Sequence, residues 1–389
     1  SSKFKEEDSK TRSRLIGEIV REGIRRTCKV KVIVDGIAVD RVIVVKEDED
    51  LAEDAFVTKT RVKFQVDENE SNEILFKSYA DTVFAKLRSY ALGHKGCEEF
   101  VRSLVDKPLT GGCLGEGKSG QLFFRSQDNR YILKTISEAE HAFLLKFLPD
   151  YYTHISFFPG TSLLCRFLFL MSFSLNNNKI RLVVMENCFY TNLPIKIHRK
   201  FDLKGSTVQR SVDMLTIESL SAVTLKDLNF TDSDLVALQG PQRDAVLKQL
   251  RQDTALLQAH NIMDYSLLLA VHHGTNQSGV DRRRNIYFVY IVDILQDYTI
   301  LKKAETVLKG SVLGQGDFMS CVHPDKYKER FDKFMEKVIV KSDSNFGSLV
   351  LPNERCLWSR SPRRRCSDSS IDDGCVSKEE EGEIDLNII

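Results

Sequence analysis

The chain has 389 residues, 42% of them hydrophobic, and its 56 basic and 55 acidic side chains nearly cancel. Such a length can bury a large core in one bilobal unit or two domains, and the balanced charge argues against a general nucleic-acid binder. The nine cysteines form no C-x-x-C pair, which is typical of a reducing compartment. We identify no signal peptide and no apolar run of about 18 residues, so we expect any membrane contact to be peripheral.

The first quarter of the chain alternates between helical and strand-like patterns. Apolar residues at helical spacing among arginines predict a basic amphipathic helix, which either lies on a membrane or, as is commoner, faces solvent. An Asp-Gly pair between two strand-like runs is typical of a hairpin. The expected elements are a disordered Ser1–Lys10, a helix over Thr11–Arg26, hairpin strands over Lys29–Val34 and Val39–Val45, a strand over Thr60–Val66 and a helix over Phe76–Ala91.

A glycine-rich stretch satisfies two phosphate-binding patterns at once. Gly112–Ser119 matches the P-loop G-x-x-x-x-G-K-S, and Gly115, Gly117 and Gly120 match G-x-G-x-x-G. A P-loop leads into a helix, whereas here the residues that follow read as strand, turn and strand, with Lys134 on the second strand. A glycine hairpin over the phosphates and a lysine on the next strand are the kinase arrangement. The alternative is an ordinary hairpin with a solvent-facing lysine.

Two aspartates lie in apolar surroundings further along the chain. Asp264 lies within His260–Leu268, and Asp293 is the one charged residue of the strand-like run Ile286–Leu295. A carboxylate at the end of a buried strand is costly unless a cation or donors meet it. Phosphoryl transfer uses one carboxylate to orient the attacking hydroxyl and another to hold Mg²⁺. Taken singly, each aspartate is better explained as a cap or a strand end, but the glycine hairpin and Lys134 favour the catalytic interpretation.

The remaining segments are consistent with a larger α+β unit. A helix over Glu138–Leu148 offers Glu138 and Glu140 as partners for the strand lysine, and Glu186 lies where an adenine-binding hinge would be. The stretch Lys196–Ser206 is too densely basic for an ordinary strand. The other expected elements are a buried core over Thr161–Leu175, a strand over Ile180–Phe189, a long helix over Thr231–His260, a final helix over Lys326–Val340 and an aperiodic tail from Lys341.

Together these motifs resemble the phosphatidylinositol phosphate kinases over roughly Phe76–Val340. The family's D-L-K-G-S-T stands at Asp202–Thr207, its I-M-D-Y-S-L-L at Ile262–Leu268 and its I-x-D-I-L-Q at Ile291–Gln296. The resemblance implies an α+β, two-lobed kinase-like fold with an antiparallel sheet in the N-terminal lobe. It implies a basic helix and hairpin extension over 1–75, a catalytic domain over 76–340 whose N-lobe runs to about 190, and a disordered tail over 341–389.

The resemblance also implies an activity. ATP and Mg²⁺ are the expected cofactors, and a phosphoinositide in an anionic membrane is the expected partner, with no nucleic acid. The chain resembles the type I branch, so the expected activity is transfer of the γ-phosphate of ATP to the 5-hydroxyl of phosphatidylinositol 4-phosphate, which makes phosphatidylinositol 4,5-bisphosphate. The alternatives are a phosphatidylinositol 5-phosphate 4-kinase and a weakly active adaptor that recruits active lipid kinases. We expect a cytoplasmic protein at the inner face of the plasma membrane, and a dimer or an association with other lipid kinases stays open.

The matching positions carry the family's functional residues. The resemblance implies these roles: Asp264, Lys134, Asp202 and Lys204 in catalysis; Asp293 in Mg²⁺ binding; Gly115, Gly117, Gly120, Lys134 and Glu186 in nucleotide binding; and Arg210, Lys302, Lys303 and Glu305 at the substrate and membrane. An acid at Glu305 is the type I feature, where type II has alanine. Two departures are Ala142, where the family's helix glutamate is expected, and Leu313–Ser320, which is not the type I loop sequence.

Overall fold

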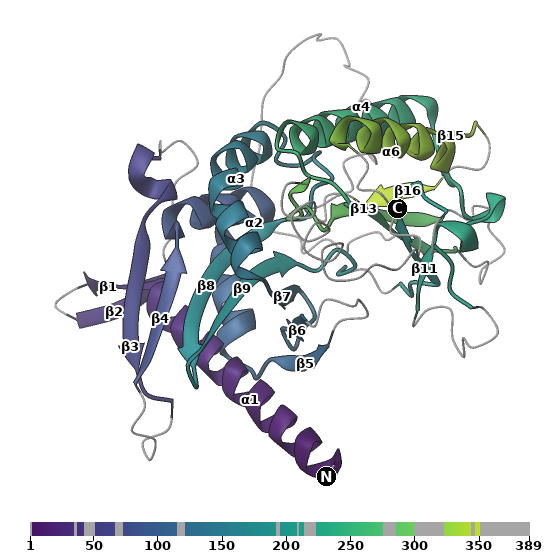
Figure 1. Ribbon diagram of the computed structural model, residues 1–389. Coiled ribbons are helices and arrows are strands. Elements are labelled where there is room, and N and C mark those ends of the chain that lie inside the picture. The colour runs from purple at the N-terminus through teal and green to yellow at the C-terminus, as the bar shows by residue number, and fades with distance from the viewer. Residues whose placement is uncertain are drawn as a thin grey trace, which may run out of the picture.

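Two β-sheets flanked by helices make up the part of the chain that the structure, a computed structural model, describes (Figure 1). That part comprises residues 2–34, 37–42, 51–66, 73–114, 121–191, 195–207, 210–213, 223–274, 285–298, 323–343 and 347–350. The architecture is mixed α+β, as expected, with one large antiparallel sheet and a second, mixed sheet.

The first sheet has seven strands in the order β3-β4-β8-β9-β7-β6-β5, and every neighbouring pair is antiparallel. Its interior strand β8 is buried on both faces, which explains its nearly uninterrupted apolar sequence. The strands are β3 (Lys59–Phe64), β4 (Ile74–Tyr79), β5 (Thr110–Leu114), β6 (Leu122–Arg125), β7 (Tyr131–Thr135), β8 (Phe167–Leu175) and β9 (Asn178–Glu186).

The second sheet has five strands in the order β11-β10-β13-β14-β16. The three central strands are antiparallel, and the edge strands β11 and β16 pair in parallel. The strands are β10 (Arg199–Leu203), β11 (Thr224–Lys226), β13 (Ser266–His272), β14 (Ile286–Val292) and β16 (Ser348–Val350). Two further sheets have two strands each. They are the antiparallel pair β1 (Lys29–Val34) with β2 (Ile37–Val42) and the parallel pair β12 (Val236–Leu238) with β15 (Ile339–Lys341).

Helices cover both sheets. Helix α2 packs on β8 and against α1 and α3, while α4 and α6 lie side by side over the second sheet (Figure 1). None of the helices in the described ranges is long and apolar enough to cross a bilayer. The helices are α1 (Ser2–Thr27), α2 (Asp81–Val105), α3 (Glu138–Phe157), α4 (Gly240–Ala259) and α6 (Pro324–Val338), with 3₁₀ turns η1 (Glu53–Phe56), η3 (Asp227–Asn229) and η4 (Asp232–Asp234).

Backbone hydrogen bonds join the two sheets. The N–H of Cys165 donates to the carbonyl of Ile291 at 2.9 Å, and the N–H of Ile291 donates to the carbonyl of Leu163 at 2.7 Å. Leu163 and Cys165 precede β8 in the first sheet, whereas Ile291 lies on β14 in the second. These two bonds therefore fix the end of β14, and the Asp293 that follows it, against the first sheet.

Several predicted elements are confirmed. β1 and β2 form the predicted antiparallel pair, although the turn residues 35–36 lie outside the described residues. β6 and β7 pair in antiparallel fashion and carry Lys134 on the second strand. The buried core expected over Thr161–Leu175 contains β8. α3, β3, β9, β14 and α6 also occupy the expected segments.

Two helix predictions were wrong in extent. Thr231–His260 is not one helix, because η4 and β12 come first and α4 begins at Gly240. Pro241 lies in the first turn of α4, where proline is tolerated, but it would break a helix that continued from Thr231. Phe76–Ala91 divides into β4 and α2, because Ala80 between them adopts a left-handed conformation with φ +49°.

Three expectations about irregular chain were also wrong. Helix α1 begins at Ser2, so Ser1–Lys10 is largely helical, which its lysines and glutamates favour once the helix is anchored further along. Lys196–Ser206 contains β10, whose buried Phe201 and Leu203 alternate with polar residues. Ser348–Val350 forms β16 beside β14, so ordered structure continues beyond Lys341, and residues 351–389 lie outside the described residues.

Candidate active site

Three charged side chains lie at one end of the three central strands of the second sheet. Lys204 follows β10, Asp264 lies two residues before β13 and Asp293 follows β14. The register pairs Leu203 with Leu267 and Ser266 with Val292, so all three positions are at the same end of adjacent strands. The antiparallel pairing thus brings together residues that are far apart in the chain.

Both aspartates are held in a left-handed backbone conformation, with φ +62° at Asp264 and φ +60° at Asp293. Asp and Asn tolerate this region better than most residues, and non-glycine residues there are often found at functional sites. A short backbone ladder holds the two loops together. The N–H of Met263 donates to the carbonyl of Gln296 at 3.1 Å, and the N–H of Tyr298 donates to the carbonyl of Asn261 at 2.9 Å.

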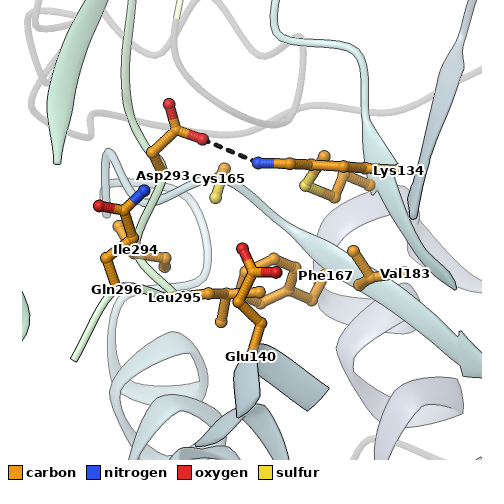
Figure 2. Close-up of a pocket in the computed structure, with 10 residues that line it drawn as sticks. Lys134, Glu140, Cys165, Phe167, Val183, Asp293, Ile294, Leu295 and Gln296 are labelled. Carbon is orange, nitrogen blue, oxygen red and sulfur yellow. Dashed lines mark hydrogen bonds and ion pairs between the residues drawn. The ribbon is translucent and has the colours of Figure 1, made fainter. Parts of the chain in front are cut away.

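Lys134 reaches from the first sheet to the second. Its Nζ lies 3.0 Å from Oδ1 of Asp293, and its side chain is only 15% exposed (Figure 2). Burial alone would lower the pKa of Lys134, but the Asp293 carboxylate outweighs burial and raises the pKa above its usual value. Lys134 is therefore a fixed positive charge that faces the second sheet.

A small pocket lies around this ion pair. Its floor is largely apolar, as expected for a planar aromatic ring bound beside a polar group. Burial raises the pKa of the Cys165 thiol in this floor to about 12, and the nearby Asp293 adds to the rise, so the thiol stays protonated and unreactive. The lining residues are Lys134, Glu140, Cys165, Phe167, Val183, Met185, Asp293, Ile294, Leu295 and Gln296 (Figure 2).

Of the two helix glutamates, Glu140 is the one in the pocket. Glu138 is largely exposed and pairs with Arg181 at 3.0 Å. The Glu140 carboxylate accepts the N–H of Ser137 at 2.7 Å and the amide of Gln121 at 3.1 Å, and it contributes to the raised pKa of Lys134. The capping box at the start of α3 therefore orients Glu140 toward Lys134.

Asp264 forms an ion pair with a second lysine, Lys204. Nζ of Lys204 lies 2.8 Å from Oδ1 of Asp264, and the lysine is the more buried of the two. Beneath them, the hydroxyl of Tyr327 on α6 donates to the carbonyl of Tyr265 at 2.5 Å, and Tyr265 packs edge-on against Tyr327 and Phe331. The Asp264 loop is thus supported from below by aromatic packing.

Asp202 and Arg210 form a separate cluster beside the end of β10. Nη2 of Arg210 lies 3.0 Å from Oδ1 of Asp202, and Nε of Arg210 donates to Oδ2 of Asp227 at 2.6 Å. Arg210 is 11% exposed, and although burial opposes it, the two carboxylates raise its pKa. The structure therefore gives these two predicted site residues mutual contacts and shows none between them and Lys134 or Asp293.

Other predicted residues lie elsewhere. Glu186 ends β9 next to Met185, which lines the pocket, but Glu186 itself does not. β5 and β6 form an antiparallel hairpin, which excludes the strand-to-helix geometry of a P-loop at Gly112–Ser119. Gly115, Gly117, Gly120, Lys302, Lys303 and Glu305, and the Leu313–Ser320 departure, lie outside the described residues.

Sequence reasoning missed two contributors. No motif in the sequence indicates that the amide of Gln121 donates to the Glu140 carboxylate. Asp227 was not singled out at all, although its carboxylate bonds three successive backbone amides near Lys204. No local pattern reveals these contacts, because each joins residues 19 or more positions apart.

The charged residues of the site are of the kinds that hold phosphates and one divalent cation. Within the described ranges, no group of three or more His, Cys, Asp or Glu side chains is arranged to enclose a metal ion. Mg²⁺, however, is commonly held by one or two carboxylates together with substrate phosphates rather than by a protein cage. Asp293 is 43% exposed beside an apolar pocket and a buried lysine, which suits this mode of binding.

Comparison with known proteins points to one family. A family model described as "Phosphatidylinositol-4-phosphate 5-Kinase" matches residues 112–285 and 273–338, which is more than half of the chain. The match begins within β5 and includes β6, Lys134, Asp264 and Asp293.

Individual relatives carry the same description. The chain is 31% identical over 325 residues to phosphatidylinositol 4-phosphate 5-kinase type-1 alpha from Homo sapiens, covering 69% of this chain and 56% of the relative. It is 30% identical over 322 residues to a phosphatidylinositol 4-phosphate 5-kinase from Plasmodium falciparum, covering 69% and 18%. It is 34% identical over 258 residues to phosphatidylinositol 4-phosphate 5-kinase its3 from Schizosaccharomyces pombe, covering 64% and 34%. The chain thus spans from about a fifth to just over half of these relatives.

Proposed function

The chain belongs to the phosphatidylinositol-4-phosphate 5-kinase family, and we propose that it transfers the γ-phosphate of ATP to the 5-hydroxyl of phosphatidylinositol 4-phosphate. The proposal rests on two neighbouring ion pairs at the ends of the central strands. Lys134 pairs with Asp293 in the pocket, and Lys204 pairs with Asp264 beside it. Phosphoryl transfer depends chiefly on positioning and on charges fixed around the phosphates. Two half-buried lysines and two accessible carboxylates meet that requirement.

Asp264 is the residue that orients the lipid hydroxyl. Its carboxylate accepts the proton of the 5-hydroxyl while the oxygen of that hydroxyl bonds to the γ-phosphorus and the bond from phosphorus to the leaving oxygen of ADP breaks. Lys204, at 2.8 Å, holds the carboxylate in position. Lys134 contacts phosphate oxygens and offsets their negative charge, and Glu140 steadies Lys134 from the opposite side of the pocket.

Asp293 is the residue that would hold Mg²⁺ together with the nucleotide phosphates. When bound there, the ion supplies positive charge to the transferred group. The apolar pocket floor takes the adenine, with Glu186 at the hinge and Gly115, Gly117 and Gly120 over the phosphates.

The two sheets then correspond to the lobes of a kinase-like fold. The seven-stranded sheet is the N-terminal lobe, and the five-stranded sheet with α4 and α6 is the C-terminal lobe. In this division residues 76–340 form the catalytic domain, and residues 1–75 contribute α1, the β1–β2 pair and the edge strand β3. Asp202 and Arg210 support the substrate side of the site.

In this proposal the protein acts on a membrane lipid as a peripheral protein at the cytoplasmic face of the plasma membrane. Lys302, Lys303 and Glu305 form the surface that meets the lipid and its headgroup. A polybasic segment gains about 1 kcal/mol per Lys or Arg at an anionic leaflet, so the nearly neutral overall charge does not oppose membrane binding.

An assay of product position tests the function. The protein is incubated with ATP and Mg²⁺ and, separately, with vesicles of phosphatidylinositol 4-phosphate or 5-phosphate, and the position of the new phosphate is determined. We expect phosphorylation of the 4-phosphate lipid at the 5-hydroxyl. Faster phosphorylation of the 5-phosphate lipid at the 4-hydroxyl would identify the rival 4-kinase. No turnover with either lipid, together with retained vesicle binding, would identify an adaptor.

Replacing Lys302 and Lys303 together with alanine is expected to weaken binding to anionic vesicles by about 2 kcal/mol, roughly 30-fold. The reason is the loss of two charges near the leaflet, and the measurement is vesicle sedimentation at low salt. The matched control replaces Lys248 and Lys337, two exposed lysines on α4 and α6, and should bind as the unmodified protein does. Equal binding of both double variants would show that Lys302 and Lys303 do not face the bilayer.

Replacing Glu305 with alanine is expected to shift preference from the 4-phosphate toward the 5-phosphate lipid by at least tenfold, about 1.4 kcal/mol. A fixed negative charge there orients the neighbouring lysines or repels a phosphate at the wrong ring position. The measurement is the ratio of kcat/KM for the two lipids in identical vesicles. The control is Glu329→Ala, an exposed glutamate on α6 paired with Lys333, which should leave the ratio unchanged. If Glu305→Ala also leaves it unchanged, Glu305 is a solvent-exposed residue without a role in specificity.

A further inference from the structure

Asp227 is a buried carboxylate close to the candidate site to which no role has yet been given. It opens the η3 turn directly after the edge strand β11, and its side chain is 5% exposed. β11 pairs in parallel with β10, so Asp227 lies beside the point where β10 ends and the chain turns toward Lys204. A buried carboxylate is costly unless donors surround it, which makes its partners informative.

One oxygen of Asp227 accepts hydrogen bonds from the backbone of the turn after β10. Oδ1 accepts the N–H groups of Lys204 at 2.9 Å, Gly205 at 2.7 Å and Ser206 at 3.3 Å. Three successive amides that converge on one anion form a concave, positively polarised nest, which the carboxylate neutralises. Gly205 adopts φ +66° in this turn, and a Cβ there would lie 3.0 Å from Phe334, so the turn requires glycine at this position.

The other oxygen extends the same network. Oδ2 of Asp227 accepts Nε–H of Arg210 at 2.6 Å, and Nη2 of Arg210 donates to the backbone carbonyl and the carboxylate of Asp202 on β10. Asp227 therefore fixes both the turn and the strand that leads into it. Lys204 emerges from this turn and places its Nζ 2.8 Å from the carboxylate of Asp264.

We propose that Asp227 is a positioning residue for phosphoryl transfer, which holds the Lys204–Ser206 turn so that the Lys204 ammonium meets Asp264. It touches no substrate and acts through the backbone amides and Arg210. The role rests on the proposed kinase function, because it matters for turnover only if Asp264 and Lys204 take part in the reaction.

The chain offers a matched control in Asp234. This aspartate lies in the neighbouring 3₁₀ turn η4, is also almost fully buried, bonds the N–H and hydroxyl of Thr231, and pairs with an arginine, Arg199. Arg199 begins β10, whereas Lys204 follows the end of β10, so Asp234 braces the opposite end of the same strand. Both aspartates have an arginine and backbone donors as partners, but only Asp227 is joined to the turn that bears Lys204.

The test compares Asp227→Asn with Asp234→Asn in the whole chain. Asparagine keeps the shape but presents N–H₂ to one of the two donor sets, either the turn amides or Arg210, so one set loses its acceptor. We expect both variants to lower the melting temperature to a similar extent. Only Asp227→Asn should lower kcat for lipid phosphorylation, about tenfold to hundredfold, with the KM for ATP within about twofold of the unmodified protein.

A second measurement does not depend on turnover. The rate at which an amine-reactive reagent modifies Lys204 is followed by peptide mass spectrometry in the same three proteins. Lys204 is 17% exposed and ion-paired, so it should react slowly in the unmodified protein and in Asp234→Asn, and at least threefold faster in Asp227→Asn. An unchanged Lys204 rate overturns the proposal, and so does a faster rate with kcat no lower than in Asp234→Asn. If the unmodified protein phosphorylates neither lipid, the proposed function has failed, and the labelling rates alone then decide whether Asp227 positions Lys204.

Discussion

Replacing Asp293 with asparagine is expected to lower kcat/KM for lipid phosphorylation by about 10³-fold or more, about 4 kcal/mol of transition-state stabilisation. A neutral amide is a much poorer ligand for Mg²⁺ than a carboxylate. The substitution also removes the carboxylate that lies 3.0 Å from Lys134 and does most to raise the pKa of that lysine. The first change reduces the positive charge available to the phosphates, and the second leaves the Lys134 ammonium without its ion-pair partner.

Asparagine is the suitable replacement because it tolerates the left-handed backbone that Asp293 adopts at φ +60°. The fold should therefore remain intact, and since Asp293 is partly exposed, we expect a stability loss of about 1 kcal/mol or less. The measurement is the initial rate over a Mg²⁺ titration, with circular dichroism to confirm folding. The control is Asp244→Asn, an exposed aspartate on α4, which should behave as the unmodified protein. A near-normal rate with unaltered Mg²⁺ dependence in Asp293→Asn would contradict its assignment as the metal ligand.

The sequence predicts strands and site residues best where the hydrophobic pattern is unambiguous. The apolar run Ile286–Leu295 contains β14, whose five central residues are all buried, and the strand-turn-strand pattern that carries Lys134 forms β6 and β7. The prediction fails where a single residue interrupts a helical pattern. Ala80 and Pro241 each mark a boundary that the periodicity of the neighbouring apolar residues does not reveal.

Contacts between distant segments could not be predicted in the same way. Glu138 and Glu140 are both plausible partners for Lys134 in the sequence, yet two helical positions differ by about 200° around the axis. Only the packing of α3 determines which glutamate lies near Lys134. In the structure Glu138 pairs with Arg181, and Glu140 lines the pocket. The convergence of three amides on Asp227 depends on β10 and β11 being neighbours, which is a property of the sheet and not of any local motif.

Replacing Asp264 with asparagine is expected to lower kcat by about 10³-fold, within the range of about 10²–10⁴ that a positioned acid–base group contributes. The amide can still accept a hydrogen bond, but it is a far weaker base and cannot take the hydroxyl proton. Asparagine also suits the φ of +62° at this position. We therefore expect the KM for ATP to change by no more than a few-fold, because the nucleotide pocket is lined by other residues. The measurement is the steady-state rate with phosphatidylinositol 4-phosphate vesicles.

The control for this change is Asp150→Asn, which removes an equally charged but more exposed carboxylate that pairs with His260 at 3.1 Å. That variant should keep at least half of the kcat of the unmodified protein. A competing explanation is that Asp264→Asn acts only by leaving the buried ammonium of Lys204 without its anion. The double variant Asp264→Asn with Lys204→Met tests the second explanation, because it removes the unpaired charge without restoring a base, and only a recovery of kcat would support that explanation. We expect the double variant to stay as slow as Asp264→Asn, and a return to within tenfold of the original kcat would show that Asp264 neutralises Lys204 and does not serve as the base.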